Sequence, residues 1–329
     1  PQIMESYYTW AIVSPQQWTE AEHIRPTYPV KNAAQQSWVS AIGSIHEQTF
    51  DGRYAYLYYY EFDLIAPISI SITRKKGDLH LLYPLQNEGM SWSYQCKSGD
   101  ISLVLEQESF YIYTPKGHYD LQVPTGRHIL IGFIIDAGLI RSPASRAYTF
   151  VVPLVEAKRG KAKAPMQSAS FPIGPLTRRA LKNIYGLLNP KELTNEYELL
   201  RFVIYLIQLS RFKLLLAAEK EQLNQPKELI RHARELLEVN IQTFGARALL
   251  SDIAELLKVP VGTLSRAHKQ YYHTSFLKYR NELLVKHVIK TIKAHDRMIE
   301  AAINSGFAGI PEMNRFLKGQ TGQSSRFFK

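Results

Sequence analysis

The chain has 329 residues, more than one ordinary hydrophobic core needs, so we expect two folded domains and a connecting element. Its composition, 45% hydrophobic and 21% charged, is typical of a folded globular protein and excludes a disordered or collagen-like chain. The single cysteine, Cys96, excludes an intrachain disulfide and a zinc site built from several cysteines. The amino terminus has no apolar stretch of signal-peptide length, and the most apolar window, residues 199–218, contains three cations. We therefore expect a soluble cytoplasmic protein.

The net charge of +11 is concentrated in the carboxyl-terminal half of the chain. Residues 1–155 carry a net charge of −3, whereas residues 156–225 carry +6 and residues 226–329 carry +8. This asymmetry predicts a polyanionic partner for the carboxyl-terminal part, nucleic acid first and an anionic membrane second. A solvated basic face would show the same charge.

Residues 45–155 contain short alternating or β-branched runs that turn-forming sequences separate. Two of these runs are Ile68-Ser-Ile-Ser-Ile-Thr73 and His128-Ile-Leu-Ile-Gly-Phe-Ile-Ile135, and Lys76-Gly-Asp78 is one of the turns. Such punctuation predicts an antiparallel sandwich or barrel. Strands and helices do not alternate here, which weighs against a parallel nucleotide-binding sheet.

Four tyrosines alternate along one predicted strand of this domain: Tyr54, Tyr56, Tyr58 and Tyr60. A strand places every second side chain on the same face, so the four rings share one face. Together with Trp92, which is nearby in the sequence, they are candidate ligand-binding residues for a pocket that stacks on a sugar or an aromatic compound. An aromatic core would give the same pattern, so both interpretations stay open.

Residues 156–175 are rich in basic residues and proline, which predicts a linker. Residues 176–188 and 191–222 then read as two helices, the hairpin of residues 176–225. We expect the second helix to pack on two sides, against the barrel or a second subunit, and to serve in dimerisation. Its first apolar face comprises Leu199, Phe202, Val203, Leu206, Leu209 and Phe212, and its second comprises Leu200, Ile204, Ile207, Leu214 and Leu215.

The strongest pattern is an internal repeat at an offset of 49 residues. Leu264-Ser-Arg-Ala-His-Lys269 aligns with Met313-Asn-Arg-Phe-Leu-Lys318. Each copy follows a predicted short helix that contains a small residue, Ala254 or Ala302, and a brief turn joins the two. A short helix, a tight turn and a second helix with basic residues form the helix-turn-helix pattern.

Within each copy we expect the apolar residue, Leu264 or Met313, to face the core and the arginine two positions later to face outward. Residues 275–294, between the copies, are predicted as one helix, which spans roughly 30 Å at about 1.5 Å per residue. This length is close to the ~34 Å between successive major-groove faces of DNA, so one chain can place two recognition helices in adjacent groove segments. Basic residues on or beside this helix, and one arginine near the carboxyl end of the sequence, are candidate phosphate contacts. They are Lys278, Arg280, Lys286, Lys290, Lys293 and Arg326.

Residues 226–329 resemble the DNA-binding domain of AraC/XylS-family transcription regulators. The similarity includes Leu250-Ser-Asp-Ile-Ala254, Leu264-Ser-Arg266, Arg315 with Lys318 and, as its most specific local element, Gly306-Phe307. The resemblance implies recognition helices at about residues 261–271 and 310–320. The sequence departs from the family at Pro260, where a capping serine is usual, and at His273, where the loop usually carries glycine.

The resemblance also implies which residues contact DNA. In the first helix they are Gly262, Thr263, Ser265, Arg266 and Lys269. In the second helix they are Ile310, Pro311, Glu312, Asn314, Arg315 and Lys318. Because Ile310 and Pro311 offer few hydrogen-bond donors, Arg315 is a candidate for either a base or a phosphate contact.

By the same resemblance, residues 1–155 are similar to the cupin-type barrel that many family members use as a sensor. A cupin enzyme needs clustered metal ligands, and the nearest approach to them is Gly77-Asp-Leu-His80 followed by Glu88. In the carboxyl-terminal domain we expect His268 to be a core histidine rather than a metal ligand. We therefore expect no metal, no cofactor and no catalytic residue.

The sequence thus predicts a multidomain α+β protein. Its parts are an antiparallel, cupin-like barrel at residues 1–155, a linker at 156–175, a helical hairpin at 176–225 and an all-α double helix-turn-helix domain at 226–329. We expect a bacterial one-component transcription regulator, a homodimer that binds promoter DNA and a small-molecule effector, with RNA polymerase as a further partner. The alternatives are a metal-dependent cupin enzyme with an accessory helical domain, and a binder of RNA or of a membrane surface.

Overall fold

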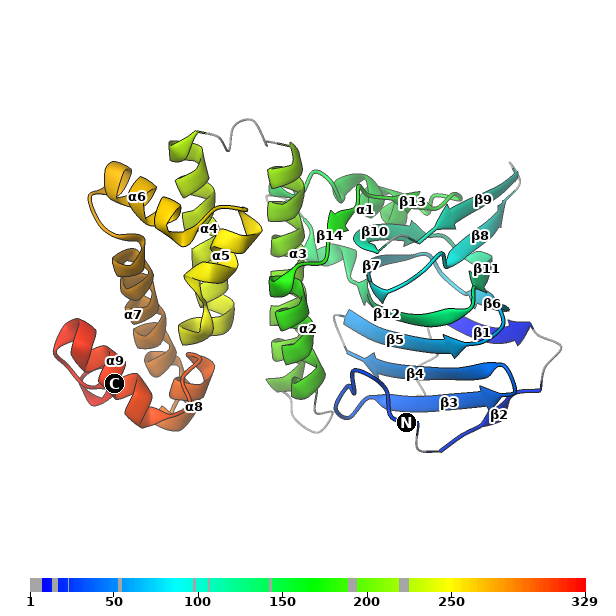
Figure 1. Ribbon diagram of the computed structural model, residues 1–329, viewed down its shortest axis with the longest axis horizontal. Coiled ribbons are helices and arrows are strands. Elements are labelled where there is room, and N and C mark those ends of the chain that lie inside the picture. Colours follow the sequence, from blue (N-terminus) through cyan, green and yellow to red (C-terminus); the bar gives the residue numbers. More distant parts are fainter. Residues whose placement is uncertain are drawn as a thin grey trace. The chain divides into compact units, whose positions relative to one another are not determined.

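The computed structural model describes residues 8–329, except residues 14–16, 23, 53–54, 97–98, 106, 142–143, 189–193 and 219–224. The chain divides into two compact units, Pro1–Val203 and Ile204–Lys329 (Figure 1). The first unit contains the β-strands and the second is helical. Among the described residues, no helix is long and apolar enough to cross a membrane.

The strands of the first unit form two antiparallel sheets. One has the order β1-β6-β11-β8-β9, and the other the order β13-β10-β7-β12-β5-β4-β3-β2, with β14 paired to β10. The strands are β1 (Tyr8–Val13), β2 (Thr19–Glu20), β3 (Ala34–Ser40), β4 (Gly43–Asp51), β5 (Ala55–Leu64), β6 (Ile68–Arg74), β7 (Asp78–Gln86), β8 (Ser91–Cys96), β9 (Gly99–Val104), β10 (Glu108–Thr114), β11 (Gly117–Val123), β12 (Gly126–Ile135), β13 (Met166–Gln167) and β14 (Phe171–Pro172). The antiparallel barrel that the sequence predicts is therefore confirmed, and its strands begin earlier, at Tyr8.

The core of the barrel lies between the two sheets. It includes Ile70 from β6 and Leu121 from β11 on one side, and Phe62 from β5 and Leu130 from β12 on the other. The alternation predicted for β5 is confirmed, because Tyr58 and Phe62 both belong to this inner cluster. Burying such apolar side chains stabilises the sheet pair by about 25 cal/mol per Å² of apolar surface removed from water.

Residues 156–175, which the sequence predicts to be a linker, are instead part of the folded barrel unit. The helix α1 (Val152–Arg159) buries Leu154 and Val155, and β13 and β14 pair with β10. Of the residues that suggested a linker, Lys161, Lys163 and Pro172 are exposed, while Phe171 is only 2% exposed. The tertiary contacts of a few apolar residues therefore override the composition of the segment.

Two helices follow, α2 (Pro175–Leu187) and α3 (Thr194–Ala218). The helix α2 is bound to the barrel, because the backbone N–H of Lys31 donates to the Tyr185 carbonyl at 2.8 Å and Asn32 donates to the Leu188 carbonyl at 2.6 Å. The first apolar face of α3 is buried as predicted, with Phe202 and Leu206 at 2% and 1% exposure. Its second face is only partly covered, since Ile204 is 39% exposed.

Among the described residues, the second unit contains α3 from Ile204 onward, six further α-helices and the short 3-10 helices Gly245–Arg247 and Ser325–Phe328. The six α-helices are α4 (Pro226–Phe244), α5 (Leu250–Leu256), α6 (Val261–Tyr272), α7 (Phe276–Ala294), α8 (Met298–Asn304) and α9 (Ile310–Thr321). Tyr205 connects α3 to α4 through a hydrogen bond to Asn240 at 2.8 Å. Figure 1 shows α7 running between two helix pairs, α5–α6 and α8–α9.

Candidate nucleic-acid interface and ligand pocket

The pairs α5–α6 and α8–α9 have the same turn geometry. In the first, the backbone N–H of Val259 donates to the Ala254 carbonyl at 3.0 Å; in the second, Phe307 donates to Ala302, also at 3.0 Å. The residue before each donor has a positive φ, 56° at Lys258 and 81° at Gly306. The two turns are 48 residues apart, whereas the recognition helices are 49 apart, so the second motif has one extra residue after its turn. The structure thus contains two helix-turn-helix motifs.

The repeated positions in α6 and α9 are oriented as the sequence predicts. Leu264 and Met313 are both fully buried, whereas Arg266 and Arg315 are both exposed. Ala254 and Ala302, at 4% and 0% exposure, lie in the interior, where small side chains permit helices to approach closely. The periodicity of an α-helix explains why a buried residue is followed two positions later by an exposed one, because the two side chains point about 200° apart around the helix axis.

The remaining candidate residues of α6 are accessible. Gly262 and Lys269 are exposed, and Thr263 and Ser265 are half-buried. The only hydrogen bond that Arg266 makes among the described residues is a long one, 3.4 Å to the Thr263 hydroxyl. Its guanidinium therefore keeps most of its five donors for a ligand.

Two candidate residues of α9 already have partners inside the domain. The Glu312 carboxylate accepts from the backbone N–H of Ala308 at 2.7 Å, in the turn that precedes α9. The Asn314 side chain accepts from the backbone N–H of Ser325 at 2.8 Å. By contrast, Arg315 and Lys318 are exposed, and Ile310 is half-buried. In α9 the basic residues are thus the ones most available to DNA.

The helix α7 carries a line of exposed lysines. The Ser275 side chain caps its amino end by accepting from the Lys278 N–H at 3.1 Å, in agreement with the predicted start of this helix. Arg280 is directed inward, because its guanidinium donates to the carbonyls of Ala246 at 2.7 Å and Ala248 at 2.9 Å. The exposed candidates for phosphate contacts are Lys278, Lys286, Lys290, Lys293 and, after α9, Arg326.

A histidine on the buried side of α6 connects this helix to α4 and to the turn that follows α6. His268 is fully buried; its Nδ1 donates to the Thr274 carbonyl at 2.7 Å, and its Nε2 accepts from Arg234 at 3.1 Å. Burial lowers the pKa of His268, and both ring nitrogens are used by protein partners. The expectation of a core histidine is therefore confirmed.

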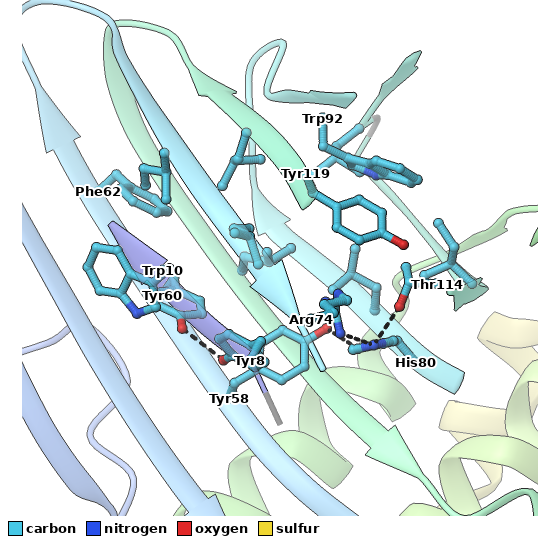
Figure 2. Close-up of a pocket in the computed structure, with 17 residues that line it drawn as sticks. Tyr8, Trp10, Tyr58, Tyr60, Phe62, Arg74, His80, Trp92, Thr114 and Tyr119 are labelled. Carbon is cyan, nitrogen blue, oxygen red and sulfur yellow. Dashed lines mark hydrogen bonds between the residues drawn. The ribbon is translucent and has the colours of Figure 1, made fainter. Parts of the chain in front are cut away.

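The barrel contains a pocket between its two sheets, with a volume of about 110 Å³ (Figure 2). Its walls are largely aromatic and aliphatic, and its polar side chains include Arg74, His80 and Thr114. The aromatic residues are Tyr8, Trp10, Tyr58, Tyr60, Phe62, Trp92 and Tyr119. A mostly apolar cavity with a few polar groups is typical of a small-molecule site.

The polar end of the pocket is a chain of hydrogen bonds. Arg74 donates to Nε2 of His80 at 2.7 Å, and Nδ1 of His80 lies 3.1 Å from the hydroxyl of Tyr58. Burial lowers the pKa of His80 well below its ordinary value, and the neighbouring Arg74 lowers it further. The imidazole is therefore neutral, so Nε2 accepts and Nδ1–H donates to Tyr58.

The structure places three of the five predicted pocket residues on its wall, namely Tyr58, Tyr60 and Trp92. Tyr56 belongs to the same inner cluster of the barrel but lines a separate surface depression, and Tyr54 lies outside the described residues. Sequence reasoning missed Tyr8, Trp10, Arg74 and Tyr119. The alternation Ile68-Ser-Ile-Ser-Ile72 continues through Thr73 to Arg74. It could have placed Arg74 on the inner face of the strand, because Ile70, Ile72 and Arg74 share one face.

The histidines and carboxylates considered for a metal site are not brought together. His80 is bonded to Arg74, and Nδ1 of His128 lies 3.3 Å from the backbone N–H of Glu88, not from its carboxylate. Within the part of the chain that the structure describes, no three His, Cys, Asp or Glu residues form a group able to hold a metal ion.

No protein-family model matches the sequence, and no curated protein matches it. Several solved structures are similar to it. An AraC-type DNA-binding regulator from Chromobacterium violaceum is 23% identical, covers 31% of this chain and 89% of its own, and has a TM-score of 0.27. ToxT from Vibrio cholerae is 11% identical, covers 84% of this chain and 98% of its own, and has a TM-score of 0.26. A cupin domain from Bordetella pertussis is 10% identical, with 27% and 91% covered and a TM-score of 0.21.

At such TM-scores the similarity adds nothing to the geometry of the site. The class of protein is defined by the chain's own architecture, an antiparallel β-barrel with a pocket and a helical unit with two helix-turn-helix motifs.

Proposed function

We propose that this protein is a one-component transcription regulator of the AraC/XylS type. It binds promoter DNA sequence-specifically through α6 and α9, and it responds to a small molecule held in the barrel. The observation that carries the proposal is the duplication of the motif, with Arg266 and Arg315 exposed at the same position of both copies. Arginine to guanine is the commonest base contact.

The length of α7 supports simultaneous binding of both motifs. Its 19 residues span about 28 Å at about 1.5 Å per residue, near the ~34 Å repeat of the major groove. Lys286, Lys290 and Lys293 are exposed along it, where they contact phosphates. Arg266 reads bases, whereas Arg315 contacts either a base or a phosphate, because Glu312 and Asn314 are already bonded within the domain.

The regulator acts as a homodimer through the second face of α3. This face presents Ile204 at 39% exposure and half-buried Leu200 and Leu215. Sedimentation of Ile204→Glu tests the assignment, and Ala217→Glu, at an exposed position on the same helix, is the matched control. We expect only the Ile204 variant to dissociate; a dimer that survives this change is held elsewhere. RNA polymerase is the further partner at the promoter, and the protein has no catalytic role.

Gel shifts with promoter and random duplexes at several salt concentrations test the DNA-binding proposal. We expect log affinity to fall with log salt at about −0.9 per neutralised phosphate. Arg266→Ala should cost about 1–3 kcal/mol on the promoter and reduce discrimination. Lys286→Ala should weaken both duplexes alike. An equal loss on both duplexes for Arg266→Ala contradicts base reading, and stoichiometric iron or zinc in the purified protein would favour the metal-dependent enzyme.

A further inference from the structure

Arg74 places a positive charge inside the barrel pocket. Its guanidinium carbon lies 5.4 Å from the ring centroid of Tyr8 and 5.6 Å from that of Tyr119, and one of its nitrogens donates to His80 (Figure 2). Among the residues that the structure describes, Arg74 forms no ion pair within 4.0 Å. A guanidinium has five N–H donors, so most of them remain for a bound molecule.

Among the described residues, the carboxylates near the pocket form no ion pair with Arg74 within 4.0 Å, although Arg74, after Lys158, lowers the pKa of Asp78, which burial raises. Asp78 lies 3.9 Å from the ammonium group of Lys158. Glu47 accepts from the Tyr60 hydroxyl and from Nε1 of Trp10 at 3.0 Å, and it does not line this pocket. His80 is neutral, so the charge on the pocket wall comes from Arg74 alone among the described lining residues. An anion with one negative charge would balance it.

The hydroxyl groups of the wall are already hydrogen-bonded. The Tyr8 hydroxyl lies 2.8 Å from that of Tyr60, the Tyr119 hydroxyl donates to the Pro115 carbonyl at 2.6 Å, and Thr114 lies 3.2 Å from His80. A sugar presents a hydroxyl on almost every carbon, and burying these without partners is costly. The pocket therefore suits a molecule with one polar end and an apolar body.

We infer that the barrel pocket binds a small monocarboxylate with one aromatic ring, whose carboxylate pairs with Arg74 and whose ring packs among Tyr8, Tyr58 and Tyr119. The inference rests on the proposed function, in which this molecule is the effector. The size agrees, because the cavity of about 110 Å³ is comparable to one of roughly 150 Å³ that holds benzene in another protein. The planar guanidinium donates two parallel hydrogen bonds to a carboxylate, and the aromatic wall favours a flat ring.

Calorimetric titration of the full chain, without DNA, tests the inference with three probes: benzoate, benzamide and cyclohexanecarboxylate. Benzamide keeps the ring and loses the charge, while cyclohexanecarboxylate keeps the charge and loses the flat ring. We expect benzoate to bind at least about tenfold more tightly than benzamide, since one charge-assisted pair is lost. Cyclohexanecarboxylate should bind more weakly than benzoate by a smaller factor.

Arg74→Met should remove the preference for benzoate over benzamide, and Arg74→Lys should restore part of it if the fold is intact. Lys75→Met removes a positive charge from the neighbouring, exposed position and should bind benzoate like the original protein. Benzoate binding that is undetectable, no tighter than that of benzamide, or unchanged in Arg74→Met would overturn the inference. Because the titration contains no DNA, none of these results bears on the DNA-binding proposal, which the gel shift tests separately.

Discussion

The ring of Tyr58 lies against the backbone of Gly132. The two residues face each other in the register that pairs β5 with β12, and a Cβ atom at position 132 would lie 2.1 Å from Cζ of Tyr58. From this position Tyr58 reaches His80, which in turn accepts from Arg74. The absence of a side chain at Gly132 thus leaves the space that the Tyr58 ring occupies in the pocket wall.

Gly132→Ala should therefore damage the pocket. The added methyl group must displace the Tyr58 ring, which separates it from His80, and overpacking of this kind costs about 1–3 kcal/mol. Urea denaturation should show that loss, and titration with benzoate should show weaker binding. Gly186→Ala in α2 is the control, because a Cβ there meets no atom within 4 Å. If Gly132→Ala is as stable as the original protein, Tyr58 can move without cost.

A second close backbone contact supports the distal helix-turn-helix motif. Gly306 has a φ of 81°, and a Cβ on it would lie 2.3 Å from the Phe244 carbonyl oxygen at the end of α4. Gly306→Ala should lower the free energy of unfolding by about 1–3 kcal/mol, since both the conformation and the space disfavour a side chain. Gly319→Ala, in the open on α9, should instead be neutral or slightly stabilising. Equal urea midpoints for the two variants would contradict this role of Gly306.

Arg234 of α4 lies over the rings of two tyrosines, one on α6 and one on α7. Its guanidinium carbon is 4.0 Å from the ring centroid of Tyr272 and 3.8 Å from that of Tyr279. Arg234→Met should lower the free energy of unfolding by about 1–3 kcal/mol, because two cation–π contacts and the bond to His268 are lost. Arg231→Met on the same helix removes two surface ion pairs and a hydrogen bond to His232 at 3.1 Å, but no cation–π contact, and should cost no more than about 1 kcal/mol. Thermal melts compare the variants, and equal losses would show that the stacking contributes nothing.

The parts of the molecule that follow a local period were predictable from the sequence. Helical spacing correctly placed Leu264 and Met313 inside and both repeated arginines outside, and strand alternation placed Tyr58 and Tyr60 on one face. Contacts between distant segments were not predictable. Tyr8 lies beside the tyrosines of β5, 52 residues from Tyr60, because β1 joins the opposite sheet through β6. The hydrogen bond of Glu312 likewise depends on the path of the backbone just before α9, and that of Asn314 on its path just after α9.

Lys213 on α3 should make the stability of the protein depend on pH. It is 4% exposed, and burial lowers its pKa to about 7. In the unfolded chain its pKa is about 10.4, so between these values the unfolded state binds more protons and stability rises with pH. Below about pH 7, Lys213 is charged in both the folded and the unfolded state, so the folded protein bears the full cost of burying that charge. Urea unfolding should give a free energy about 2 kcal/mol larger at pH 9.5 than at pH 7.5. Lys213→Met should abolish most of that increase and be more stable at pH 7.5, whereas Lys293→Met, on the exposed side of α7, should keep it. A pH dependence that is the same in both variants would show that Lys213 titrates normally in the folded protein.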